Sequence, residues 1–227
     1  ALLEKAPFVW WNDRLWGVKA LIAKGRKAEA LQYAEASHGR NNNPESIAQA
    51  CEEILLSSGM ADEAYQRYAI VANQGTTYLA TFRAICRKYP YKTPVDILND
   101  LVISTPGQAG KWFAAAKDAG LYELAIELAR QSPVDHRTLN RAAADFIETQ
   151  PGFAIDAGLL SMYWILAGRG YEATVIDVIV AFEAIMRAAT VAGNVDKTLL
   201  RVRTLLDSYP QEHLVHGALA KAPGLWG

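Results

Sequence analysis

Hydrophobic residues recur along this chain at intervals of three or four, the spacing that places them on one face of an α-helix. The pattern predicts about thirteen helices. Their predicted ranges are 13–24, 27–37, 44–58, 61–73, 77–89, 94–104, 107–119, 121–131, 136–149, 152–167, 172–192, 195–208 and 211–220. Because no run alternates apolar and polar residues as a half-buried strand does, we predict an all-α fold.

Capping residues mark where the predicted helices begin and end. Asn43-Pro44, Thr93-Pro94 and Thr105-Pro106 each place a side-chain oxygen before a proline. The oxygen can accept a free amide of the first turn, and proline suits the first helical position. Glycine in the left-handed conformation closes many helices. The glycines that follow apolar runs are Gly25, Gly59, Gly120 and Gly193. Connections are short, which predicts antiparallel neighbours, and one longer loop is expected over residues 37–43.

Three segments share one local pattern, in which a glycine is followed five residues later by an alanine that opens an amphipathic helix. The pairs are Gly25 and Ala30, Gly59 and Ala64, and Gly120 and Ala125. The first two glycines are 34 residues apart. Glycine turns the chain between two helices, and the small alanine allows the helices to approach closely. We therefore expect these alanines to be buried where paired helices cross.

This pattern resembles the tetratricopeptide repeat, whose second helix opens in the same way. The resemblance covers residues 1–131 and implies a right-handed α-solenoid of antiparallel helix pairs. Residues 132–227 are interpreted as an irregular helical continuation of one helical-repeat domain over 1–227. In such a solenoid the first helices of the pairs line a concave surface that suits a peptide or a helix.

Composition and charge narrow the classes of protein. The chain has 227 residues, 51% of them hydrophobic, and a net charge of −1, which is typical of a globular protein and disfavours a nucleic-acid partner. Cys51 and Cys86 lie inside apolar helical patterns and are expected to be reduced, packed thiols. No membrane span is predicted, because the longest apolar stretch, over 174–193, contains three charged residues. The first residues do not have the pattern of a signal peptide, so a cytoplasmic location is expected.

No motif predicts a catalytic residue, a cofactor site or a metal site. Residues 168–173 read Gly-Arg-Gly-Tyr-Glu-Ala, a shortened dinucleotide fingerprint, but no second strand follows them, and an interhelical turn is the better interpretation. His213 and His216 can share a helix face but lack further ligands. Glu52 and Glu53 are interpreted as a solvated helix face.

Two basic groups and the aromatic residues near them are the candidates for binding a partner. Arg83 and Arg87 are spaced to point the same way, and their forked donors suit a carboxylate or a phosphate. Trp112 and Phe113 are adjacent on a predicted helix, so one ring is expected to be partly exposed. The candidate partner-binding residues are Arg83, Arg87, Lys88, Tyr91, Trp112, Arg137 and Arg141.

These features favour a non-enzymatic module that binds a protein or peptide partner on its concave face. One alternative is a ligand-responsive regulatory domain that binds a small anionic molecule. Another is an enzyme with no readable motif. The sequence leaves the oligomeric state open.

Overall fold

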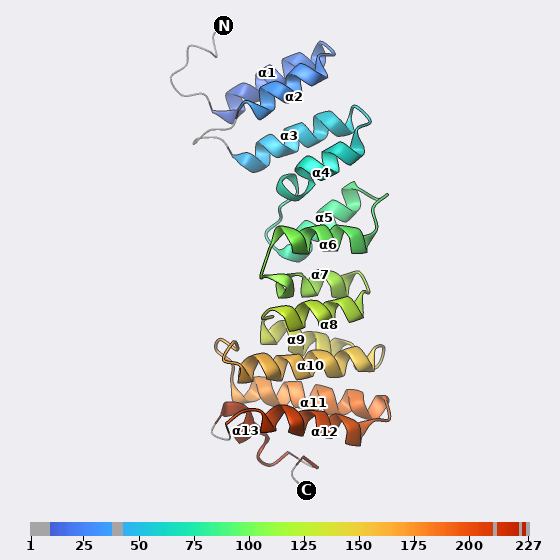
Figure 1. The fold of residues 1–227 in the computed structure, drawn as a ribbon, viewed down its shortest axis with the longest axis vertical. Coiled ribbons are helices and arrows are strands. Elements are labelled where there is room, and N and C mark those ends of the chain that lie inside the picture. The colour runs from blue at the N-terminus through green and yellow to red at the C-terminus, as the bar shows by residue number, and fades with distance from the viewer. Residues whose placement is uncertain (1–9, 38–42, 211–212, 223, 226–227) are drawn as a thin grey trace. The chain divides into compact units, whose positions relative to one another are not determined.

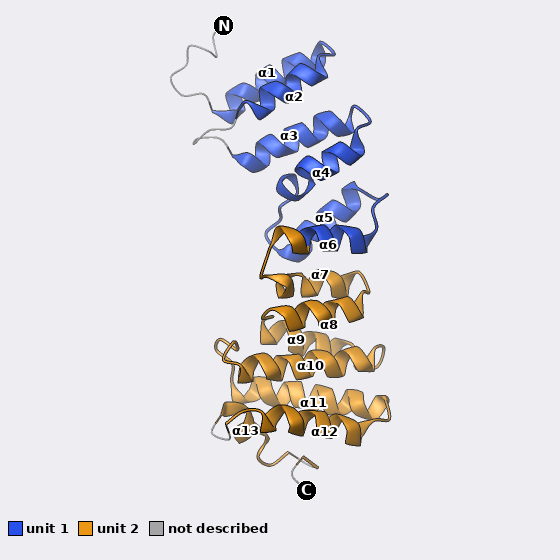
Figure 2. Ribbon diagram, viewed as in Figure 1, with its two compact units in different colours: residues 1–101 blue, residues 102–227 orange. Residues whose placement is uncertain are grey.

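The computed structural model describes residues 10–37, 43–210, 213–222 and 224–225. Within these residues the chain forms thirteen α-helices and one short 3-10 helix, with no strand, which confirms the all-α prediction. Of the loop predicted over 37–43, residues 38–42 lie outside the described ranges. The chain divides into two compact units, Ala1–Leu101 and Val102–Gly227 (Figure 2), and the boundary falls inside α6.

In the first unit, α1 to α5 contact mainly their neighbours in the sequence (Figure 1). Its helices are α1 (Trp11–Ala23), α2 (Lys27–Glu35), α3 (Pro44–Leu56), α4 (Ala61–Ala72), α5 (Tyr78–Lys88) and α6 (Pro94–Ser104). The contact between α3 and α4 is the most extensive of these. Ala30 and Ala64 are fully buried, as the repeated pattern predicts. Gly25 and Gly59 adopt φ of +72° and +76° and close the preceding helices, so their expected role is confirmed.

The second unit is built around one almost wholly buried helix, α10. Its helices are η2 (Ala109–Trp112), α7 (Phe113–Asp118), α8 (Tyr122–Gln131), α9 (His136–Asp145), α10 (Pro151–Leu166), α11 (Val175–Val191), α12 (Val195–Asp207) and α13 (Leu214–Leu219). α10 contacts α8 and α12, while α11 contacts α9 and α13. A Cβ on Gly158 would lie 2.5 Å from a side-chain carbon of Ile185, so this glycine permits the close approach of α10 and α11.

Helix boundaries depart from the prediction mainly at the start of the second unit. A helix was expected over 107–119, but η2 precedes a short α7. The Gly110 amide donates to Ser132 Oγ at 2.7 Å, and a Cβ on Gly110 would lie 2.3 Å from the Ser132 carbonyl. The loop after α8 therefore packs closely against this turn, and residues 109–112 form a 3-10 turn where the first turns of an α-helix were expected. Thr105, expected to cap the helix, instead accepts a hydrogen bond from the indole of Trp112.

Candidate functional site

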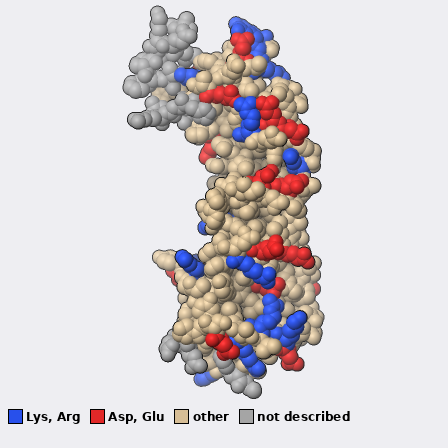
Figure 3. All heavy atoms as spheres, in the orientation of Figure 1, with Lys and Arg blue, Asp and Glu red and all other residues tan. Residues whose placement is uncertain are grey.

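Charged side chains of both signs are interspersed on the face of the molecule shown in Figure 3. The predicted basic group of the first unit lies on α5 and just after it. Arg83 and Arg87 are exposed, as predicted. Lys88 is turned toward α3, and its Nζ lies 2.5 Å from Glu52 Oε2. The charge of Lys88 is therefore used within the fold, whereas Arg83 and Arg87 place their guanidinium groups at the surface of this helix.

Glu52 is fully buried, so its interpretation as part of a solvated face was wrong. Three donors satisfy its carboxylate. Tyr89 donates its hydroxyl to Oε1 at 2.6 Å, Asn73 donates its amide to the same oxygen at 2.7 Å, and Lys88 reaches Oε2. Burial, together with the hydrogen bond to Glu52, raises the pKa of Tyr89. A buried charge needs such partners, so this cluster holds α3, α4 and α5 together.

Tyr91 is half exposed, and its ring makes an edge contact with that of Tyr89 at 6.2 Å between centroids. Burial and a hydrogen bond to Asp62 raise its pKa. Lys92 places its Nζ 4.6 Å from the ring centroid of Tyr65. The aromatic residues that flank the basic group thus belong to the packing of α4 against the segment after α5, with one face of Tyr91 left at the surface.

Trp112 is buried, at 3% exposure, and so is Phe113 beside it. The expectation that one of these rings would be exposed was wrong. Trp112 ends the 3-10 turn rather than lying within an α-helix, and its Nε1 donates to Thr105 Oγ1 at 2.7 Å. The two rings therefore both point into the second unit, and a surface partner has no access to Trp112 in this conformation.

Arg137 and Arg141 are exposed on α9, one turn apart on the same face. The guanidinium of Arg137 lies 3.6 Å from Glu172 Oε2, just before α11. Several large apolar side chains are exposed just before α11, on its first turns and at the start of α13: Tyr171, Val175, Ile176, Ile179, Val180 and Leu214. Four of them follow one another along the first turns of α11, and Ile176 is 70% exposed. We call these four residues, Val175, Ile176, Ile179 and Val180, the α11 apolar face.

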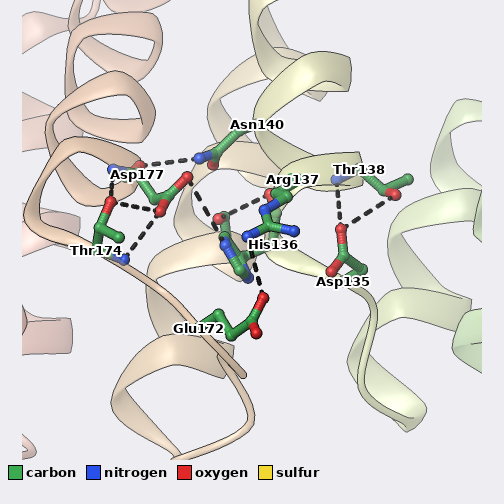
Figure 4. Close-up of polar contacts among 9 residues, drawn as sticks. Asp135, His136, Arg137, Thr138, Asn140, Glu172, Thr174 and Asp177 are labelled. Carbon is green, nitrogen blue, oxygen red and sulfur yellow. Dashed lines mark hydrogen bonds and ion pairs between the residues drawn. The ribbon is translucent and has the colours of Figure 1, made fainter.

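The starts of α9 and α11 are joined by a polar cluster (Figure 4). Asn140 donates its amide to the Asp177 carbonyl at 2.8 Å, and His136 Nε2 lies 3.7 Å from Asp177 Oδ1. Asp177 also accepts from the amide and hydroxyl of Thr174 in a capping box. The hydrogen bonds from Thr174 keep the pKa of Asp177 below its usual range. The cluster fixes the start of α11 next to α9, the helix that carries Arg137.

His136 and Asp177 are the pair in this cluster that a general base would need, but the arrangement is structural. His136 is 1% exposed, and its backbone carbonyl accepts from Ser161 of α10. Within the described residues, His136 Nε2 and Asn140 Oδ1 are buried without a hydrogen-bond partner. A general base must come within hydrogen-bond reach of the proton it removes. The imidazole has no such access to a substrate here.

The segment that resembles a dinucleotide fingerprint is an interhelical turn. The residues before it form the end of α10, and Gly168 closes that helix with φ of +70°. His213 Nδ1 accepts from the Val215 amide at 3.3 Å and caps α13. Among the described residues, no cluster of three or more His, Cys, Asp or Glu side chains could hold a metal ion. None of the described helices has the length and apolarity that crossing a membrane requires.

The described structure contains no disulfide at Cys51 or Cys86, as expected. Cys51 is buried beside Tyr68, and burial raises the pKa of its thiol to about 11. A thiol with so high a pKa is a poor nucleophile at neutral pH. Cys51 therefore packs as an apolar residue of the first unit.

No protein-family model, no curated protein and no solved structure matches the chain. The α11 apolar face was not among the residues that the sequence singled out. Its signal was the unbroken apolar run Val178–Phe182 and the apolar residues before it. The sequence could not separate these residues from the core, because both faces of α11 carry apolar residues there.

Proposed function

We propose that this protein is a helical-repeat module that binds a protein or peptide partner through the surface of α9 and α11. The proposal of a helical-repeat architecture is supported by the alternation of contacts. In the second unit, α8, α10 and α12 contact one another in succession, and so do α9, α11 and α13. Stacked helix pairs produce such alternation, with the first helices in one layer and the second helices in the other.

The observation that carries the proposal is the exposed α11 apolar face on a helix that packs against α9, which carries Arg137 and Arg141. Monomeric proteins rarely expose contiguous apolar patches, and such patches mark interaction sites. Arg137 pairs with Glu172 just before α11, and Arg141 lies one turn further along α9, the helix that packs against α11. A partner segment that presents apolar side chains next to a carboxylate matches this surface.

The proposal is tested with purified wild-type and variant proteins as bait, followed by quantitative mass spectrometry of what they capture from the native source. Ile176→Asp introduces a charge at the centre of the patch. Ile103→Asp is the matched control, because Ile103 is 76% exposed and lies on α6 rather than on α9 or α11. We expect a partner whose capture falls at least tenfold with Ile176→Asp and with Arg141→Ala, and which Ile103→Asp retains.

Two results bear on the location of the site. Equal capture by all variants, each with an unchanged circular dichroism spectrum, would refute the α9–α11 surface. A bait carrying Arg83→Ala and Arg87→Ala tests the exposed arginines of α5 in the same experiment. Loss of capture there alone would assign the binding surface to the first unit instead.

A further inference from the structure

A hollow of about 490 Å³ lies between α8, α10 and α12, in the layer opposite to α9 and α11. This volume is within the range of small-molecule sites, roughly 300–1,000 Å³. Four leucines are among the residues that line it, Leu159 and Leu160 of α10 and Leu200 and Leu205 of α12. Leu200 is 61% exposed although it borders a concave surface, so apolar area is available there to a ligand.

At one end of the hollow, two arginine side chains form ion pairs with the same carboxylate, that of Asp156. Asp156 of α10 contacts Nη2 of Arg201 of α12 through Oδ1, and its Oδ2 lies 3.8 Å from Arg130 Nη2 of α8. The three groups together carry a net charge of +1. Each guanidinium has five N–H donors, and Asp156 engages only a fraction of them. Both arginine side chains are substantially exposed, at 58% for Arg130 and 41% for Arg201.

We propose that this hollow is a binding site for a small organic anion with an apolar body, such as a medium-chain or aryl carboxylate. The carboxylate of the ligand takes the remaining donors of Arg130 and Arg201, while its apolar part covers the leucines. A cation is disfavoured, because the one carboxylate in the wall is already engaged by two guanidinium groups. The site lies in the other layer from the α11 apolar face and does not depend on the proposed partner surface.

The test uses octanoate as the probe and octylamine as its oppositely charged counterpart, titrated into the full chain by isothermal titration calorimetry. We expect saturable binding of octanoate with one site per chain, and at least tenfold weaker binding of octylamine. Arg201→Gln removes a charge-assisted hydrogen bond and should weaken octanoate binding about tenfold or more. Leu200→Asp places a negative charge at the rim and should abolish it.

Asp156→Asn makes the test independent of folding defects, because the expected effect has the opposite sign. Without the competing carboxylate, the two arginines offer more donors and a higher net charge, so octanoate should bind several times more tightly. Ile103→Asp, outside the hollow, should leave the affinity unchanged. Equal affinities for octanoate and octylamine, an unchanged affinity in Arg201→Gln, or no saturable octanoate binding at millimolar concentration would each overturn the proposal.

Discussion

Replacing Tyr89 by Phe tests whether the buried carboxylate of Glu52 depends on its neutral donors. Tyr89 and Glu52 are both fully buried, and the hydroxyl donates to Oε1 at 2.6 Å. Phe keeps the ring and removes only the hydroxyl, so the packing of α3 against the residues after α5 is preserved. No solvent reaches the carboxylate to replace the lost donor. A hydrogen bond to a charged group contributes about 1.5–3 kcal/mol, and we expect the free energy of unfolding of the first unit to fall by that amount.

The matched control is Tyr91→Phe, two residues later. Tyr91 is half exposed, so water can replace the partner of its hydroxyl, and we expect a loss of at most about 0.5 kcal/mol. Urea denaturation followed by circular dichroism gives the total change. Because two units need not unfold together, amide hydrogen exchange of α3–α5 locates the change in the first unit. A loss for Tyr89→Phe no larger than that for Tyr91→Phe would refute the reasoning, since it would mean that Lys88 and Asn73 alone satisfy the carboxylate.

Two further predictions concern packing and pH. Ala64→Leu should destabilise the first unit by about 1–3 kcal/mol through overpacking, because Ala64 is fully buried. Ala28→Leu, at an exposed position of α2, should be neutral in the same urea titration. Equal effects would show that Ala64 is not a close-packing position. The lowered pKa of Asp177 means that the unfolded chain takes up its proton first. The contribution of ionised Asp177 to the free energy of unfolding is therefore complete above an ordinary aspartate pKa of about 3.9. It is lost as the pH falls through the lower pKa of the folded state. Melting temperatures between pH 6 and pH 3 should therefore fall less steeply for Asp177→Asn than for wild type, and parallel curves would contradict this assignment.

The helices could be predicted because their signals are local. Apolar spacing fixes which residues face inward, and Gly25, Gly59 and Gly120 take the positive φ that ends a helix. The turn at η2 could not be predicted, because it depends on the approach of Gly110 to the loop after α8. That contact joins segments distant in the sequence. It also determines that Trp112, which a continuous helix would place differently, is buried.

For the same reason, the candidate site could be predicted only in part from the sequence. The exposure of Arg83, Arg87, Arg137 and Arg141 follows from helical periodicity. Glu52 gave no local sign of burial, since its donors Lys88 and Tyr89 follow it by more than thirty residues. The grouping of Arg130 and Arg201 around Asp156 likewise requires three helices to meet. Charge clusters assembled by tertiary contacts are thus the part of this protein that spacing along the chain does not show.

The packing of helices mainly on their sequence neighbours also has a consequence for synthesis. The contacts that form the first compact unit lie within residues 1–101, including the cluster around Glu52. This unit can therefore complete its contacts as the chain leaves the ribosome, before α10 has been translated. Domains generally fold as units in this order during translation, and contacts between near neighbours form quickly. The almost wholly apolar α10 is different: α8 and α9 precede it, but α11 and α12 must be made before its remaining surface is covered. The interval between translation of α10 and of α12 is when the nascent chain exposes most of the apolar surface of this helix and most needs protection from aggregation.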